Sequence, residues 1–404
     1  MSVDVMDFVG EELEDLRQRH LYRRLRELQG PQGARATFDG REVINLSSNN
    51  YLGLTTHRRL VHAAIAATER FGAGSGSVRT IAGTMTLHER LEEKLAEFKH
   101  TQAALVFQSG FTCNSGVIPI LVGEGDAILS DELNHASIID GIRLTHAQRK
   151  IWRHADMDSL ESALADTQSA RRRLVITDGV FSMDGDLAPL DKIVDLSERY
   201  GAMVFVDDAH ASGVFGKDGR GTVDHFGLHG RVHVQVGTLS KAIGVLGGYV
   251  ACSQALRELL IHKGRPFLFS TSHPPGVTAA CIEAIDVLRT EPLLIERLWD
   301  NTRHFKDGLH RLGLNTGNSQ SPITPVIAGS GEKATRLSNR LFEEGVFAQG
   351  IGYPTVPDDR SRVRTIVTAT HTREDLDAAL HAFEVVGQEL DLVGAGQPAA
   401  SAGA

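Results

Sequence analysis

The residues MVFVDDAHASGVFG, at positions 203–216, are the stretch that points most directly to the fold. Met203–Val206 is an apolar run too short for a helix, and acidic residues follow it at once. Working outward, similar runs occur at Ala103–Phe107, Ala127–Ser130 and Arg173–Thr177. Amphipathic stretches lie between them, at Leu87–Phe98, Met157–Thr167 and Leu190–Tyr200. This alternation predicts an α/β fold, in which a mostly parallel sheet has helices on both faces.

The pattern changes after about Asp286, where long helical stretches dominate. Three helices are expected in this part, at Leu293–Leu312, at Glu332–Glu344 and from Arg373 to about Leu390. Two weak strands are expected near Ile323–Ile327 and Arg362–Thr368. We therefore predict an N-terminal arm at 1–45, a large domain at 46–290, a smaller C-terminal α+β domain at 291–393 and a disordered tail at 394–404.

Composition narrows the class of protein. The chain has 404 residues and a net charge of −9. It is too apolar to be disordered, and its acidity argues against nucleic acid as a partner. The three cysteines form no CxxC motif, which favours a reducing cytoplasm. No signal peptide and no apolar run long enough to cross a membrane are evident. We therefore expect a cytoplasmic protein with no membrane partner.

Residues that can carry chemistry follow the predicted strands. In parallel sheets, ligands bind beyond the carboxyl ends of the strands, so Asp207 is well placed to pair with a protonated ring nitrogen. Lys241 lies in GTLSKAIG among small and apolar residues, where desolvation would lower its pKa and make the amine nucleophilic. The alternatives without a chemical role are a helix cap for Asp207 and a solvated side chain for Lys241. A metal site at Asp207 and His210 has no supporting ligand spacing, so no metal is expected.

Two further turns lead from a strand into a helix. After Ala103–Phe107, the backbone amides around Gly110 and Phe111 would form an anion site at a helix N-terminus, although an ordinary capped turn is the alternative. After Ala127–Ser130 comes His135, which either lies flat over a bound ring or has a purely structural role.

Taken together, the motifs resemble the α-oxoamine synthase family of enzymes that use pyridoxal 5'-phosphate (PLP) and have fold type I. The matching stretches are Asn49–Leu54, Ser77–Thr84, NHASIIDG at Asn134–Gly141, DGVFSMDGD at Asp178–Asp186, DDAHASGVFG at Asp207–Gly216, GTLSKAIG at Gly237–Gly244 and RPFLFSTSHPP at Arg265–Pro275. The likeness runs from about residue 5 to 390. It implies a PLP-dependent transferase of fold type I, whose large domain has a mostly parallel seven-stranded sheet.

The resemblance assigns a role to each residue around the cofactor ring. Lys241 would be the Schiff-base lysine, and Asp207 would pair with the pyridinium nitrogen. His135 would stack on the ring face, while Ser182 and His210 would hydrogen-bond the phenolic oxygen. Lys241, His135 and His210 are therefore the expected catalytic residues.

The same resemblance places the phosphate and the substrate. Gly110, Phe111 and Thr238 would bind the cofactor phosphate. Ser270 and Thr271 would complete the phosphate site of a neighbouring subunit, so that a homodimer shares its active sites.

The amino-acid carboxylate would be bound by Arg364, with help from Asn49. Arg362, two residues earlier on the same predicted strand, is an alternative for part of that role.

The activity implied by the resemblance is the condensation of an amino acid with an acyl-CoA, both small-molecule partners. NHASIIDGIRL and GRPFLFS favour the glycine C-acetyltransferase (2-amino-3-ketobutyrate CoA ligase) subgroup, which acts in threonine and glycine metabolism. There, glycine and acetyl-CoA give 2-amino-3-oxobutyrate and CoA, with Lys241 as general base. SMDGDLAPL and Ser270–Thr271 also suit 8-amino-7-oxononanoate synthase, which joins alanine to a pimeloyl thioester with loss of CO2 in biotin synthesis. A non-catalytic PLP-fold binding protein is the alternative from another class.

Overall fold

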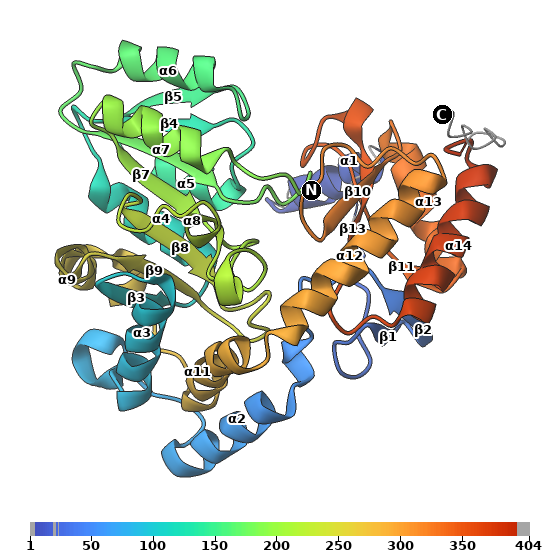
Figure 1. The fold of residues 1–404 in the computed structure, drawn as a ribbon, viewed down its shortest axis with the longest axis horizontal. Coiled ribbons are helices and arrows are strands. Elements are labelled where there is room, and N and C mark those ends of the chain that lie inside the picture. The colour runs from blue at the N-terminus through green and yellow to red at the C-terminus, as the bar shows by residue number, and fades with distance from the viewer. Residues whose placement is uncertain (1–4, 19–21, 23, 394–404) are drawn as a thin grey trace, which may run out of the picture.

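The computed structural model describes residues 5–18, 22 and 24–393, and it is built around a seven-stranded sheet (Figure 1). The strand order is β3 (Ala103–Phe107), β9 (Gly248–Cys252), β8 (Val234–Thr238), β7 (Met203–Asp207), β6 (Arg173–Asp178), β4 (Ala127–Asp131) and β5 (Gln148–Trp152). β9 pairs antiparallel with both of its neighbours, whereas the other pairs are parallel. The predicted fold class, α/β with a mostly parallel seven-stranded sheet, is confirmed.

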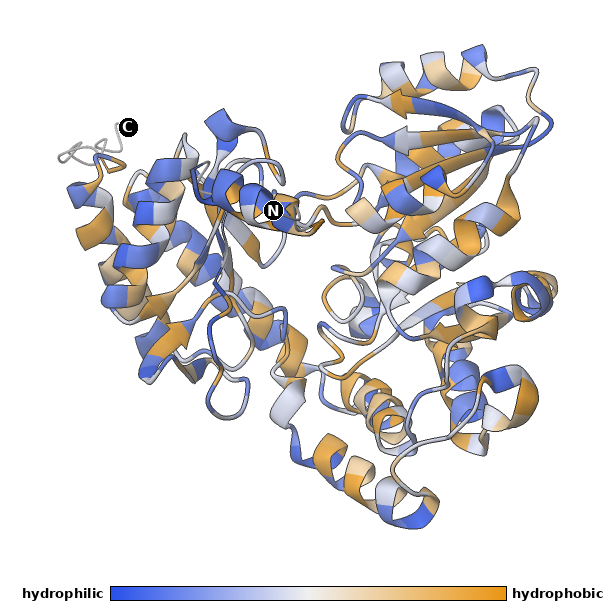
Figure 2. Ribbon diagram, turned by 180° about the vertical axis from the view of Figure 1, so that it is seen from behind, coloured by the Kyte–Doolittle hydropathy of each residue, from blue (hydrophilic) through white to orange (hydrophobic). Residues whose placement is uncertain are grey.

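Successive strand residues point to opposite faces of this sheet, and both faces are buried. Leu105 and Phe107 pack with one group of helices, whereas Ala104 and Val106 pack with another. The first group is α4 (Gly110–Leu121), α5 (Ala136–Arg143), α9 (Gln254–Lys263) and α10 (Arg265–Leu268). The opposite face has α3 (Thr86–Lys99), α6 (Met157–Asp166), α7 (Leu190–Arg199), α8 (Thr222–His225) and α11 (Pro275–Thr290). The strands are accordingly among the most hydrophobic segments in Figure 2.

A second lobe is built mainly from the C-terminal part of the chain (Figure 1). Its antiparallel sheet has the order β10 (Ile323–Ile327), β13 (Arg362–Ile366) and β12 (Gln349–Ile351). The long helices of this lobe are α12 (Leu293–Arg311), α13 (Gly331–Glu343) and α14 (Arg373–Glu389), which share one apolar core with β10 and β13. This core makes the lobe a distinct packing unit.

The N-terminal residues contribute to both lobes. α1 (Asp7–Gln18) has no buried residue. β1 (Arg35–Phe38) pairs with β2 (Arg41–Asn45), and β2 pairs in parallel with β11 (Val346–Phe347) in the C-terminal lobe. α2 (Arg58–Phe71) packs against α11 of the large lobe. Short helical turns lie at Leu54–Thr56, Arg79–Gly83, Lys217–Gly219 and Asp358–Arg360. The predicted domain boundaries themselves stay predictions, and the predicted disordered tail lies outside the described residues.

Three observations concern membrane-spanning helices, metal sites and cysteines. No helix in the described part of the chain is long and apolar enough to cross a membrane. Within residues 5–18, 22 and 24–393 there is no cluster of three or more His, Cys, Asp or Glu that could hold a metal ion. Cys113, Cys252 and Cys281 are all buried and unpaired.

Candidate active site

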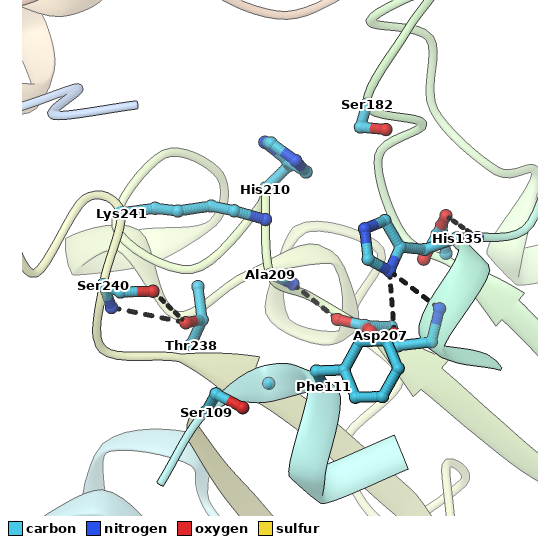
Figure 3. Close-up of a pocket in the computed structure, with 13 residues that line it drawn as sticks. Ser109, Phe111, His135, Ser182, Asp207, Ala209, His210, Thr238, Ser240 and Lys241 are labelled. Carbon is cyan, nitrogen blue, oxygen red and sulfur yellow. Dashed lines mark hydrogen bonds between the residues drawn. The ribbon is translucent and has the colours of Figure 1, made fainter. Parts of the chain in front are cut away.

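The carboxyl ends of the parallel strands bring the candidate residues to one edge of the large sheet. Asp207 ends β7, Asp178 ends β6 and Thr238 ends β8. A cavity of about 200 Å³ lies at this edge. Of the predicted site residues, eight line it: Gly110, Phe111, His135, Ser182, Asp207, His210, Thr238 and Lys241. Figure 3 shows Lys241 and Ser182 entering the cavity from different loops, with His210 between them and His135 on the side opposite Lys241.

The Asp207 carboxylate is buried and held by two donors. Its Oδ1 accepts from the backbone N–H of Ala209 at 2.9 Å, and its Oδ2 accepts from Asn114 Nδ2 at 2.7 Å. The Asn114 amide also donates to Ser137 Oγ at 2.8 Å. These bonds fix the orientation of the carboxylate at the base of the cavity, where it can pair with a cationic ring nitrogen. The sequence analysis missed Asn114, which lies one turn inside α4.

Lys241 has the environment of a nucleophilic amine. It follows β8 by three residues, and its Nζ has no hydrogen bond or ion pair within the described residues. Burial lowers the pKa of Lys241 to about 8; the negative charge of Asp207 opposes this shift, and the positive charge of Arg364 adds to it. The pKa shift that the apolar neighbours of Lys241 led us to expect is therefore present, and its main cause is desolvation.

His135 is held as a neutral ring at the start of α5. Its Nδ1 accepts from the backbone N–H of Ser137 at 3.2 Å, and its own backbone N–H donates to Asp178 Oδ2 at 2.9 Å. Burial lowers the pKa of His135, with Asp207 opposing and Lys241 reinforcing the shift. A neutral, fixed imidazole can lie against the face of a planar ring without a charge penalty. The sequence analysis did not assign a role to Asp178.

His210 is paired with a residue that was not predicted. Its Nδ1 lies 2.7 Å from the hydroxyl of Tyr51. Burial drives the pKa of His210 well below its usual range and raises the pKa of Tyr51, so that both groups are neutral. A protonated phenol can donate to Nδ1, which leaves the Nε2 proton of His210 for an oxygen in the cavity.

The N-terminus of α4 lies at the cavity, where the anion site was predicted. The Ser109 side chain caps the helix by accepting from the backbone N–H of Thr112 at 3.1 Å. The backbone amides of Gly110 and Phe111 have no acceptor among the described residues. Thr238 adds a hydroxyl, which lies 2.7 Å from Ser240 Oγ. Unpaired amides at a helix N-terminus together with two hydroxyls suit a phosphate group.

Four predicted site residues do not line this cavity. Arg364, on β13, donates through Nη2 to Asn49 Oδ1 at 3.3 Å. The Arg364 Nε is buried without a partner, and burial lowers the pKa of Arg364. Its charge is near enough to affect Lys241. An under-satisfied guanidinium beside the cavity suits a carboxylate ligand, as predicted for Arg364 and Asn49.

Ser270 and Thr271 lie away from the cavity of their own chain. They follow α10, and the carbonyl of Thr271 accepts from Gln108 Nε2 at 2.9 Å. The Thr271 backbone also forms a bridge with Val78. Their predicted contribution to the site of another subunit stays a prediction.

Arg362 is not available as the alternative carboxylate-binding residue. Its Nη1 donates to Asp184 Oδ1 at 2.7 Å and to the carbonyl of Met183 at 3.1 Å. The side chain is 1% exposed. Period-2 spacing places Arg362 and Arg364 on the same face of β13, as expected, but Arg362 is already paired.

The residues present fit PLP. The cavity is lined by a fixed carboxylate, a flat imidazole, an unpaired buried amine, and free amides with hydroxyls. A pyridinium ring, an aldehyde carbon and a phosphate are the groups that these positions suit.

Comparison with known proteins agrees with this geometry. A family model described as aminotransferase class I and II matches residues 41–383. Serine palmitoyltransferase from S. paucimobilis, solved with PLP and myriocin bound, is 31% identical and has a TM-score of 0.91, over 97% of this chain and 100% of that one. The chain therefore belongs to the aminotransferase class I and II family, and it is a PLP-dependent, acyltransferase-type enzyme of fold type I.

Relatives of higher identity indicate the subgroup within the family. 8-Amino-7-oxononanoate synthase from Symbiobacterium thermophilum is 68% identical over 96% of this chain and 99% of its own length. The protein described as 8-amino-7-oxononanoate synthase 1 from Bacillus subtilis is 57% identical over 96% and 99%. The solved 8-amino-7-oxononanoate synthase from Francisella tularensis has a TM-score of 0.74 at 27% identity, over 86% and 98%.

These relatives correct the expected subgroup. The glycine C-acetyltransferase function predicted from NHASIIDGIRL and GRPFLFS is wrong, because the relatives at 57–68% identity are 8-amino-7-oxononanoate synthases. The physical reason is that neither motif reports on the substrate: NHASIIDGIRL contributes His135 and Ser137 to the cofactor cavity, and GRPFLFS lies outside the lining of that cavity. SMDGDLAPL and Ser270–Thr271 pointed to the subgroup that the relatives favour.

Proposed function

We propose that this chain is an 8-amino-7-oxononanoate synthase, which condenses alanine with a pimeloyl thioester and releases CoA and CO2. The observation that carries the proposal is the 68% identity to such an enzyme over 96% of the chain. The compared length spans 388 of the 404 residues, so the segments that line the cofactor cavity lie within it.

Each residue then has a defined task in that reaction. When bound, PLP supplies an electron sink for a carbanion at the amino-acid Cα. Arg364 and Asn49 bind the alanine carboxylate and so orient the Cα–H bond. Lys241, whose pKa of about 8 leaves a useful neutral fraction at pH 7, takes the proton from Cα as general base. His135 and Asp207 would hold the ring in place, and His210, whose Nδ1 faces Tyr51, would have its Nε2 proton for the phenolic oxygen.

We further propose a cytoplasmic homodimer with shared active sites. Ser270 and Thr271 do not line the cavity of their own chain. Two exposed apolar side chains lie near them. Phe269, which precedes Ser270 in the chain, is 71% exposed. Ile81, close to the Val78–Thr271 bridge, is 82% exposed. Such apolar side chains are typical of protein interfaces, which supports a partner subunit at this surface.

A substrate matrix tests the proposed function. The PLP-loaded enzyme is incubated with alanine or glycine, each with pimeloyl-CoA or acetyl-CoA, and the release of CoA and CO2 is followed. We expect strong turnover only with alanine and pimeloyl-CoA, with one CO2 released for each CoA. Lys241→Ala is the control and should give no turnover. Turnover of all four pairs at similar rates, or CoA release without CO2, would contradict the proposal.

A further inference from the structure

A short hairpin carries Ser182 into the active-site cavity. Val180 pairs with Leu187 across it, and within it the N–H of Gly185 donates to the carbonyl of Phe181 at 2.8 Å. We refer to residues Phe181–Leu187 as the Ser182 hairpin. Figure 1 shows it as a green loop that leaves the large sheet and extends towards β10 and β13. Ser182 itself has no hydrogen bond to the rest of the described chain, so the shape of the hairpin sets its position.

The base of the hairpin is fixed to the large sheet through His154. His154 Nε2 lies 2.7 Å from Asp186 Oδ2, and its Nδ1 lies 3.0 Å from Asp131 Oδ1, at the end of β4. Burial lowers the pKa of His154, but the hydrogen bonds and charges of Asp131 and Asp186 outweigh this effect and raise the pKa to about 10. The imidazolium therefore bridges two carboxylates, and its ring packs edge-on against Phe181 at 4.4 Å.

The tip of the hairpin is fixed to the C-terminal lobe through Arg362. Arg362 donates to Asp184 Oδ1 at 2.7 Å and to the carbonyl of Met183 at 3.1 Å, both in the hairpin. The Gly185 carbonyl also accepts from the N–H of Gln320 at 3.0 Å. A Cβ at Gly185 would lie 2.3 Å from the carbonyl oxygen of Ile323 in β10, so the backbones touch here.

These contacts join two halves of the same site. Arg362 begins β13, and Arg364 lies two residues further along the same face of that strand. Ser182 lines the cavity, whereas Arg364 lies outside its lining and contacts Asn49. The ion pair between the buried Arg362 and the half-buried Asp184 is thus a direct tether between the hairpin that carries Ser182 and the strand that carries Arg364.

We propose that Arg362 is a positioning residue, which acts through Asp184 to fix the separation of Ser182 and Arg364. This inference rests on the proposed function in that it takes Arg364 as the carboxylate-binding residue. Productive geometry in an active site tolerates displacements of well under ~1 Å before rates fall steeply. Without the tether, only the contacts of Gly185 with Gln320 and Ile323 would hold the tip of the Ser182 hairpin to the C-terminal lobe, and the separation of Ser182 and Arg364 would be less tightly fixed.

The test reads amino-acid binding from the absorbance of bound PLP, with no thioester present. Arg362→Met removes the guanidinium and keeps most of the side-chain volume, while Asp184→Asn removes only the partner charge. Arg360→Met is the matched control. Arg360 lies 3.5 Å from the same Asp184 oxygen, but its side chain is 58% exposed, so its ion pair is screened by solvent. Ser182→Ala is the reference for loss of the contact to the cofactor.

We expect Arg362→Met and Asp184→Asn to weaken alanine binding about tenfold, and to shift the cofactor absorbance in the same direction as Ser182→Ala. Arg360→Met should stay within about twofold of the wild type. Unchanged alanine affinity in a folded Arg362→Met protein overturns the proposal, whether or not its melting temperature is lowered. If Arg362→Met does not fold, Asp184→Asn decides by the same criterion.

This design separates failure of the positioning role from failure of the proposed function. If the wild type binds glycine and not alanine, the 8-amino-7-oxononanoate synthase proposal fails, while the same titration with glycine still reports on Arg362. If the wild type binds alanine and the Arg362 variant binds it equally well, only the positioning role fails.

Discussion

At Lys241, burial rather than a neighbouring base generates the reactive amine. A lysine in water is almost fully protonated at pH 7, whereas a pKa of about 8 leaves roughly a tenth of the amine neutral. The folded chain disfavours the charged form before any cofactor arrives, so the residue is prepared to attack an aldehyde carbon.

We therefore predict a defined pH dependence for covalent attachment of PLP to the cofactor-free protein. The neutral amine is the attacking species, so the attachment rate should rise as pH rises, about tenfold per unit below pH 8, and level off above it. Stopped-flow absorbance at pH 6–9 measures this rate. Lys241→Ala is the control and should show no attachment, and a rate that keeps rising tenfold per unit up to pH 9 without levelling off would exclude the lowered pKa.

Some site residues could be predicted from the sequence, and others could not. Asp207, His135 and Lys241 each follow an apolar strand, so the rule that ligands meet the ends of parallel strands found them. The same rule could have found Asp178, because it ends β6. Nothing local distinguishes Asn114, which faces Asp207 only after α4 packs on the sheet.

Tyr51 and Arg362 were ambiguous for a related reason. Their roles depend on partners far away in the sequence: Tyr51 contacts His210, and Arg362 contacts Asp184. Period-2 spacing correctly placed Arg362 beside Arg364, but it could not show that Asp184 already occupied the guanidinium. Substrate choice was missed because it depends on side chains around the acyl chain, outside the cofactor motifs.

Among the elements, β9 approaches the start of α4 closely, beside the predicted phosphate site. A Cβ at Gly248 would lie 2.4 Å from the carbonyl carbon and oxygen of Ser109, and 2.5 Å from the backbone nitrogen of Gly110. Real Cβ atoms do not come this close to backbone, so any side chain at this position must displace the turn.

Gly248→Ala should therefore weaken PLP binding by about tenfold and lower the free energy of unfolding by about 1–3 kcal/mol, as overpacking does. Gly123→Ala is the matched control, because a Cβ there meets nothing within 4 Å. Fluorescence titration with PLP and urea unfolding give the two quantities. Equal cofactor affinity in both variants would show that the turn can move at no cost.

The strands show where sequence patterns are sufficient and where they are not. The predicted run Ala103–Phe107 matches β3, and the runs predicted for β4, β6 and β7 each end one residue early. All four strands are buried and have near-continuous apolar sequences, although β3 pairs antiparallel with β9 whereas β4, β6 and β7 pair in parallel with one another. β5, with the sequence QRKIW, has mostly exposed or half-buried side chains, and that polarity hid it.

At the scale of the whole molecule, the two lobes share part of their packing. Ile323 and Ile366 of the C-terminal lobe belong to the same buried cluster as Tyr51 and Val180. This shared cluster, together with the Ser182 hairpin, makes the lobes a continuous support for one active site. The contacts between the lobes join residues that are far apart in the chain. The change in pattern after about Asp286 therefore marked the C-terminal lobe but did not reveal these contacts.

The proposed shared site of the homodimer can be tested by mixing subunits. A Lys241→Ala protein and a Ser270→Ala/Thr271→Ala protein should each be weakly active or inactive alone. After joint unfolding and refolding, a mixed dimer would contain one fully intact site, so about a quarter of the wild-type activity should return. Analytical ultracentrifugation checks that dimers have re-formed. If each site is built from a single chain, mixing will restore nothing.

The burial of all three cysteines makes the chain convenient for spectroscopy. Burial raises the pKa of Cys252 and of Cys281 to about 12 and that of Cys113 well above its usual range, so few thiolates are available to react with alkylating reagents. A single cysteine introduced on the surface of each lobe would then take a fluorophore selectively, without prior removal of the native thiols. Changes in distance between the lobes during turnover could be followed in an otherwise unaltered protein.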